Sequence, residues 1–267
     1  MRAYKSIFLI RLINGLQYKA VAIGAVFMRF FWGLMEILAY AALFGMGQGS
    51  FSMTFTQTVS YVWMQQIVFV LFRVVVGDEE IFSALAQGTI AYELVRPVSL
   101  YGHWFFQSAA NRIVPTVLGS MPLLVIVPFM PGKYRMVFPA SAGQVLLFLV
   151  SCVLALGVVV AFAMLMYISL FYLTTQRGIR IIVTAITHFF SGGMIPLSFF
   201  PDQVRQAAEL LPFASMRDVP LQIWCGTLMG ADACRGLLLQ LFWLAALITA
   251  GYAWMGQAIK KVVVQGG

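Results

Sequence analysis

The chain has 267 residues, of which 61% are hydrophobic and only 10% are charged, and its formal net charge is +8. Soluble domains contain about 45–50% apolar and about 25% charged residues, so this composition excludes a water-facing globule and indicates a protein embedded in lipid. The length then fits one membrane domain, residues 1–267, rather than two soluble domains. Membrane topology and anionic lipid account for the positive charge, so no nucleic-acid partner is expected.

Six apolar runs are long enough to cross a bilayer. A spanning helix needs about 20 mainly apolar residues, and the alternating ten-residue strands of a membrane barrel do not occur in the sequence. We therefore predict an all-α integral membrane protein with six transmembrane helices. The runs cover approximately residues 21–44, 58–76, 104–130, 145–173, 179–200 and 237–257.

The distribution of Lys and Arg predicts the orientation, because cytoplasmic loops carry an excess of these residues. An N-terminus inside the cell places ten basic residues on the cytoplasmic side and five outside. We expect a multi-pass protein of the cytoplasmic (inner) membrane with both termini in the cytoplasm. The inner set is Arg2, Lys5, Arg11, Lys19, Arg73, Arg96, Arg177, Arg180, Lys260 and Lys261, and the outer set is Lys133, Arg135, Arg205, Arg217 and Arg235.

Residues 1–20 form an amphipathic lead-in to the first run. Ile7, Phe8, Leu12 and Leu16 recur at helical spacing, and basic residues alternate with them. Such a pattern is typical of a helix that lies on the inner leaflet. A simple cytoplasmic extension of the first span is the alternative.

A polar segment, residues 77–103, separates the second and third runs and is expected in the cytoplasm. Its acidic residues would occupy the first turn of a helix, where negative charge suits the helix dipole. The apolar residues that follow would form an exposed knob suited to docking a partner, whereas a solvated connector is the alternative. The residues expected to couple to that partner are Asp78, Glu79, Glu80, Ile81, Phe82, Leu85, Gly88, Glu93, Leu94, Arg96 and Pro97.

Residues 191–236, between the fifth and sixth runs, mix short apolar pieces with four prolines. Neither a full span nor a soluble loop fits this pattern. We predict short re-entrant helices that dip into the outer leaflet, because irregular backbone at that depth must be covered by protein. An ordinary outer loop with one surface helix is the alternative. Cys225 and Cys234 fall on the predicted outer side, and the sequence leaves open whether they are bridged.

The sequence contains no motif for nucleotide binding, metal binding or hydrolysis. The pair Gly132-Lys133 is followed by Tyr134 and lacks the upstream glycine of a P-loop. His103 and His188 are far apart and have no carboxylate beside them in the sequence. We therefore expect no intrinsic catalysis, no metal and no cofactor bound by this chain.

Several polar residues nevertheless fall inside the predicted spans. Ionisable residues at that depth are costly and often functional. Arginines near the inner interface can instead snorkel or pair structurally, and Glu36 can belong to a structural ion pair. The candidate residues for a translocation pathway are Arg29, Glu36, Asn111, Arg112 and His188.

Four stretches of the sequence resemble a known family. They are QGTIAYELVRPVSLY (residues 87–101), GGMIPLSFFP (192–201), LLPF (210–213) and VPLQIWCG (219–226). Together they resemble the membrane subunits of type-2 ABC exporters, in the branch of short six-span permeases. The resemblance implies that segment 77–103 is a coupling helix seated in a separate ATPase subunit. It also implies an outer gate made by Gly193, Ile195, Pro196, Pro201, Pro212, Phe213 and Pro220.

The expected function is therefore that of a permease subunit in an ATP-driven exporter. Two P-loop ATPase subunits would bind ATP and Mg, and a second copy or a homologous permease would complete the transporter. The aromatic content of 15% and the few charges favour an amphipathic or lipid-like substrate. The alternatives are an ion-coupled secondary transporter that uses Glu36, Arg29 and Arg112, and a membrane scaffold. Neither alternative explains a docking segment between the second and third spans.

Overall fold

A computed structural model describes residues 19–46, 51–76, 79–86, 90, 93, 99–173 and 176–260. These residues form helices joined by turns and contain no strand, which confirms the all-α prediction. The predicted interfacial helix of residues 1–20 lies outside the described residues apart from its last two. The helices are α2 (Lys19–Gly45), α3 (Phe55–Ile67), α4 (Glu79–Ala86), α6 (Leu100–Ile126), η1 (Val127–Phe129), η2 (Gly132–Tyr134), α7 (Ala142–Ser169), α8 (Gln176–Phe190), η3 (Leu197–Phe199), α9 (Asp202–Leu210), α10 (Pro212–Met216), α11 (Asp218–Trp224) and α12 (Gly230–Ile259).

Four helical segments of the described chain are long and apolar enough to cross a membrane. They are Gly24–Gly45 in α2, Leu100–Phe129 in α6 and η1, Ala142–Ser169 in α7, and Gly230–Ile259 in α12. At 1.5 Å per residue, α7 extends for about 40 Å, which exceeds the hydrocarbon thickness of a bilayer. The protein is thus a multi-pass membrane protein.

The other two predicted spans contain shorter helices. Helix α3 has 13 residues and ends at Ile67, although the chain beyond it stays mostly buried as a series of turns. Helix α8 has 15 residues and ends at Phe190, just before a turn in which Gly192 adopts φ 75°. The hydropathy of a run does not distinguish a continuous helix from buried turns, so the count of six spans stays a prediction.

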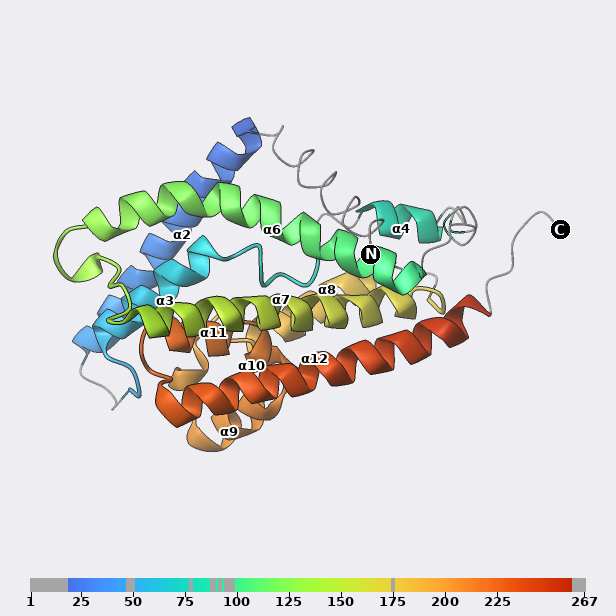
Figure 1. Cartoon of the computed structure of the whole chain (residues 1–267). Coiled ribbons are helices and arrows are strands. Elements are labelled where there is room, and N and C mark those ends of the chain that lie inside the picture. The colour runs from blue at the N-terminus through green and yellow to red at the C-terminus, as the bar shows by residue number, and fades with distance from the viewer. Residues whose placement is uncertain are drawn as a thin grey trace.

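Helix α7 is the central helix of the bundle and contacts α6, α8, α11 and α12 (Figure 1). Gly157 allows α12 to approach closely, because a methyl group added there would lie 2.8 Å from Leu244 Cδ1. Buried polar groups join the same helices. The Gln240 amide donates to the carbonyls of Ser151 (3.2 Å) and Ser215 (2.9 Å) and accepts from Ser151 Oγ (3.0 Å). This network fixes α7, α10 and α12 relative to one another.

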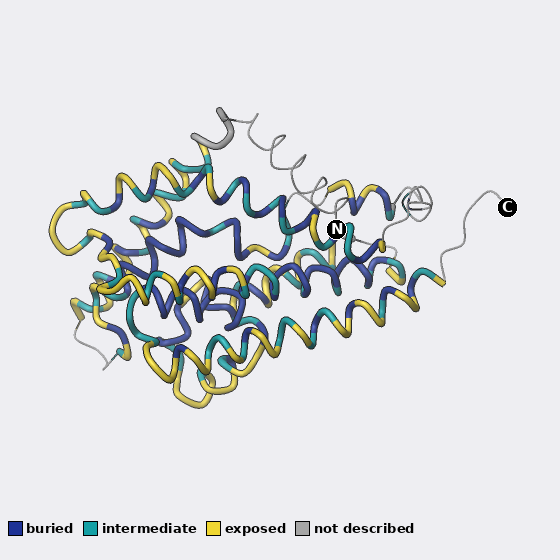
Figure 2. The backbone as a smooth tube through the Cα atoms, in the orientation of Figure 1, coloured by how far each residue is buried: buried dark blue, intermediate teal, exposed yellow. Residues whose placement is uncertain are grey.

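Segment 191–236 folds into η3, α9, α10 and α11. Prolines begin three of these helices: Pro196 and Pro201 are the N-caps of η3 and α9, and Pro212 is the first residue of α10. Helices α10 and α11 are largely buried against α3, α7 and α12, whereas α9 is mostly exposed (Figure 2). The predicted short helices are present, and their depth in the bilayer stays a prediction. Cys225 and Cys234 are both free thiols.

Candidate functional site

Helix α4 lies beside the start of α6, at the opposite end of the bundle from η1 (Figure 1). Ile81 and Phe82 are buried against the start of α6 and the second half of α7, and Leu85 is partly buried in the same cluster. The prediction of an exposed apolar knob is therefore wrong: the apolar face of α4 packs on this chain's own helices. Its exposed face carries Glu79, Glu80 and Ser83.

Phe82 is held between two other helices. Its ring meets Tyr167 of α7 edge to face at 5.5 Å, and the Arg180 guanidinium of α8 lies 4.3 Å above it. Arg180 Nη2 also forms an ion pair with Glu79 Oε1 at 2.7 Å. These contacts attach α4 to both α7 and α8.

The coupling segment is attached to α6 as well. Glu80 Oε2 accepts a hydrogen bond from Gln107 Nε2 at 3.1 Å, and Glu93 Oε2 accepts one from Trp104 Nε1 at 2.6 Å. Glu79, Glu80, Ile81, Phe82, Leu85 and Glu93 thus belong to one anchored unit. The remaining predicted coupling residues lie outside the described residues; they are Asp78, Gly88, Leu94, Arg96 and Pro97.

Arg112 of α6 is one of the residues predicted in the translocation pathway, and its side chain forms hydrogen bonds that hold two segments of the protein together. Its side chain is fully buried, Nε donates to the Arg73 carbonyl at 2.9 Å and Nη1 donates to the Ser108 carbonyl at 2.7 Å. Nη2 donates to the Val74 carbonyl. The guanidinium therefore attaches the chain that leads into α4 to the middle of α6. Of the two roles considered for Arg112, a pathway residue or a structural one, these bonds support the structural role.

Glu36, His188 and Gly193 line one cavity of about 320 Å³, here called the Glu36 cavity. Sequence reasoning proposed all three residues, and the fold brings them together. Glu36 accepts a hydrogen bond from Gln66 Nε2 at 3.3 Å and, within the described part of the chain, forms no ion pair with Arg29. The other lining residues are Trp32, Met35 and Met194.

The remaining pathway candidates lie elsewhere. Arg29 packs against Gly119 of α6 and over the Phe69 ring at 5.8 Å from its centroid. Asn111 is half-buried beside Arg112 and lines neither the Glu36 cavity nor the cavity described next. The five predicted residues therefore do not form one continuous set.

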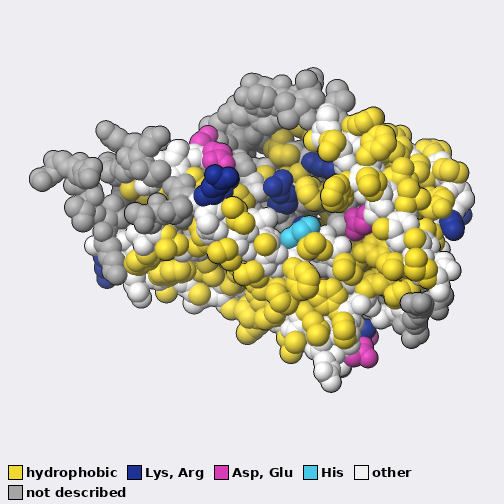
Figure 3. Space-filling view, turned by 180° about the vertical axis from the view of Figure 1, so that it is seen from behind, with side chains coloured by type: hydrophobic (Ala, Val, Ile, Leu, Met, Phe, Trp, Pro, Cys, Tyr) yellow, Lys and Arg dark blue, Asp and Glu magenta, His cyan; other side chains and the backbone are white. Residues whose placement is uncertain are grey.

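A second cavity of about 270 Å³ shares His188 with the first and is here called the Arg217 cavity. Arg217 Nη1 lies 3.1 Å from His188 Nδ1. On the face shown in Figure 3, basic, acidic and histidine side chains lie within an otherwise largely hydrophobic surface. The lining residues are Phe69, Phe72, Arg73, Val74, Val75, Thr184, Thr187, His188 and Arg217.

The sequence did not identify Arg73 and Arg217 as candidate site residues. They were used only as positive charges that indicate which side of the membrane a loop occupies. Gly192 and Gly193, which follow α8, were the sequence feature that could have indicated this site. A methyl group at Gly193 would overlap both the Arg217 guanidinium and the His188 ring, and one at Gly192 would lie 2.8 Å from the Tyr61 hydroxyl. Two adjacent glycines therefore indicate that large side chains approach this backbone closely.

Three of the predicted outer-gate residues, Gly193, Ile195 and Pro196, follow α8 closely in the chain, and Phe213 contacts it. The Phe213 ring meets Phe162 of α7 at 5.4 Å and Phe190 of α8 at 6.1 Å, so α10 is joined to both helices by aromatic contacts. Ile195 is exposed, and Pro220 lies buried within α11. The other residues of this set, Gly193, Pro196, Pro201 and Pro212, occupy the turns and helix starts already described.

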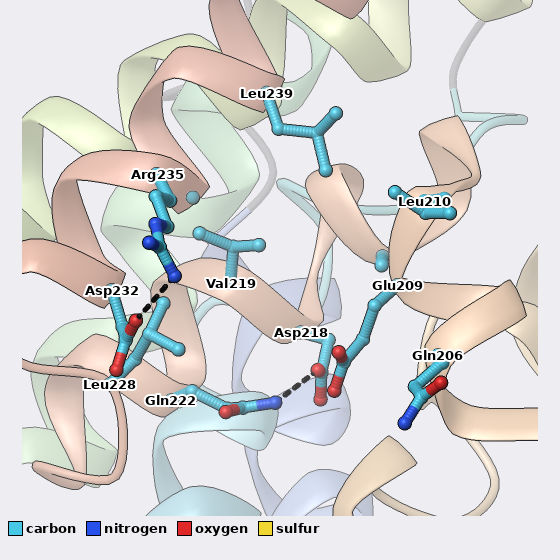
Figure 4. A pocket seen from close by; sticks show the side chains of 12 residues that line it. Gln206, Glu209, Leu210, Asp218, Val219, Gln222, Leu228, Asp232, Arg235 and Leu239 are labelled. Carbon is cyan, nitrogen blue, oxygen red and sulfur yellow. Dashed lines mark hydrogen bonds and ion pairs between the residues drawn. The ribbon is translucent and has the colours of Figure 1, made fainter. Parts of the chain in front are cut away.

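A third cavity, of about 470 Å³, lies among α9, α11 and α12 (Figure 4). Asp218 accepts hydrogen bonds from the Tyr61 hydroxyl at 2.8 Å and from Gln222 Nε2, and Arg235 pairs with Asp232 at 3.5 Å. Burial raises the pKa of Glu209 in α9, although the Arg205 charge acts in the opposite direction. No cluster of three or more metal-ligating side chains occurs within the described ranges.

These features define the class: a helical, multi-pass membrane protein with cavities lined by both polar and apolar side chains and an anchored short helix between α3 and α6. Residues 30–266 match the family model of ABC-2 family transporter proteins, so the chain belongs to the ABC-2 transporter family. The resemblance seen in the sequence is thereby confirmed. The membrane domains of this family are permeases that work with an ABC ATPase subunit and are not ATPases themselves. No curated protein matches the sequence.

Proposed function

We propose that this chain is the permease subunit of an ATP-driven exporter that moves an amphipathic or lipid-like substrate across the cytoplasmic membrane. Family membership over residues 30–266 supports the permease assignment. A partner ATPase would bind ATP and Mg, and both termini of the permease would lie in the cytoplasm beside it.

The attachment of α4 to three helices is the observation that carries this proposal. Phe82 contacts Tyr167 of α7 and Arg180 of α8, and Glu80 is bonded to Gln107 of α6. A helix held in this way moves as one unit with the membrane bundle. Closure of two ATPase subunits against the exposed face of α4 would therefore shift the equilibrium between inward-facing and outward-facing states.

The surface around the Arg217 cavity supports pairing with a second permease. Arg73 and Thr184 are exposed at this cavity, in a chain whose surface is otherwise strongly apolar. Charged and polar groups in the membrane face protein or water rather than acyl chains. A second copy, or a homologous permease, would cover this face and enclose a translocation pathway, while the helices around Phe213 would form its outer gate.

Purification from the native membrane in a mild detergent tests the proposal. The wild-type chain is expected to retain a P-loop ATPase and a second permease, both identified by mass spectrometry. The double variant Glu79→Lys with Glu80→Lys reverses the charge of the exposed α4 face. We expect this variant to remain in the membrane and to lose most of the ATP hydrolysis activity that co-purifies with the wild-type permease.

Asp232→Lys is the matched control, because Asp232 is an exposed, ion-paired acid at the far end of α12. It should retain the ATPase at the wild-type ratio. Wild-type activity in the α4 double variant would contradict the coupling role of α4. Repeated preparations of the wild-type chain without an ATPase would contradict the exporter itself.

A further inference from the structure

We propose that the Arg217 cavity binds the anionic head group, a phosphate or a carboxylate, of an amphipathic molecule. The binding site stands on the geometry alone, and its assignment to the transported substrate rests on the proposed function.

Two buried donors in the cavity lack acceptors. Arg217 is 3% exposed and its Nε has no hydrogen-bond partner, while its Nη1 faces only the His188 ring. Thr187 is 4% exposed and its hydroxyl also lacks a partner. Buried polar groups are nearly always hydrogen-bonded, and an unpaired buried charge is more costly still. Both residues line the cavity, so an oxyanion bound there would place a negative charge beside the Arg217 guanidinium.

The described residues that line the cavity include two arginines and no carboxylate. Within the described part of the chain, no carboxylate forms an ion pair with Arg217. Arg73, also in the lining, is close enough to repel both Arg217 and Arg29. Glu36, in the neighbouring cavity, attracts Arg217 more strongly than Arg73 repels it, and its carboxylate accepts a hydrogen bond from Gln66. An anionic ligand would relieve this repulsion, whereas a cation would increase it.

The remaining walls are apolar, which indicates that the ligand is amphipathic. Phe69 lies beneath the guanidinium of Arg73 at 5.6 Å and beside Arg29, so the cationic cluster rests on an aromatic ring. The Glu36 cavity, which shares His188 with this one, is also lined by Trp32 and Met35, and both are largely exposed. A head group at Arg217 would therefore leave its hydrocarbon portion room along α2.

A binding titration on the purified permease in nanodiscs of zwitterionic phosphatidylcholine tests the site. The probes are hexyl phosphate, inorganic phosphate and hexyltrimethylammonium, and calorimetry gives the dissociation constants. Arg217→Gln and Arg73→Gln should each weaken hexyl phosphate binding by about tenfold or more, the effect of losing one charge-assisted hydrogen bond. Arg73→Gln preserves the fold, because Arg112 bonds to the backbone carbonyl of residue 73 and not to its side chain.

Arg205→Gln is the matched control, since Arg205 already pairs with Asp202 and Glu209. It should leave hexyl phosphate binding unchanged. Inorganic phosphate that binds as tightly as hexyl phosphate, and is weakened by the same variants, would support the anion site and identify a free anion as its ligand. Hexyl phosphate that binds wild type and both variants equally would overturn the proposal, as would equal binding of hexyltrimethylammonium.

This titration needs no ATPase, so it separates the two proposals. A permease that binds hexyl phosphate through Arg73 and Arg217 but never retains an ATPase keeps the anion site and refutes the exporter. A complex that retains its ATPase but shows no arginine-dependent binding refutes the anion site alone.

Discussion

Arg112 and Arg217 are both buried arginines, and they differ in what their donors contact. Arg112 donates to the carbonyls of Arg73, Val74 and Ser108, so its charge is surrounded by acceptors. Arg217 faces His188 and keeps a buried Nε without a partner. The first arginine holds α6 to the chain before α4, and the second lines a cavity and keeps a buried donor without a partner. The acceptors around a buried charge, more than its depth, distinguish a structural role from a binding role.

The largest effect is expected for Arg112→Gln. The substitution leaves buried carbonyls without donors, at about 1–3 kcal/mol for each unsatisfied group, so stability should fall by roughly 2–5 kcal/mol. Arg217→Gln removes an unpaired buried charge and should leave the stability nearly unchanged. Thermal unfolding of both variants in the same detergent measures the difference. An equal loss of stability would show that both arginines are structural.

Gly193→Ala should have an intermediate effect. The added methyl group would overlap the Arg217 guanidinium and the His188 ring, and overpacking of this kind costs about 1–3 kcal/mol. Combining Gly193→Ala with Arg217→Gln should recover part of the loss, because the shorter side chain removes the overlap with the guanidinium but not the overlap with the His188 ring. The measurement is a double-mutant cycle by thermal unfolding.

Gly256→Ala is the control for that cycle, because a methyl group at Gly256 meets no atom within 4 Å. It should be neutral or slightly stabilising, since alanine favours a helix more than glycine does. Additive effects of Gly193→Ala and Arg217→Gln would show that the glycine is needed for another reason.

The smallest effect on stability is expected at the surface of α4. Glu79→Gln and Arg180→Gln break an ion pair in which Glu79 is 75% exposed, and such pairs contribute about 0–1 kcal/mol. A double-mutant cycle should give a coupling energy in that range, reduced by added salt. A much larger value would mean that α4 is held to α8 chiefly by charge and not by the packing of Phe82.

The sequence predicted part of the candidate site. Glu36, His188 and Gly193 were proposed from the polarity of the predicted spans and from a family resemblance, and they line one cavity. Arg73 and Arg217 could not be assigned to it, because they are 144 positions apart in the chain and each was explained as a topology charge. The orientation of α4 was also undecided, since an amphipathic helix can present its apolar face to a partner or to its own bundle.

Composition and long apolar runs determined that this protein is a helical membrane protein, because the bilayer imposes one length and one hydrogen-bonding pattern on any spanning segment. The family also followed from the sequence, through local motifs that the family match confirmed. Only the tertiary structure decided which arginine is structural and which lines a cavity. That distinction depends on acceptors contributed by distant segments, and the linear order of residues does not specify where those segments meet.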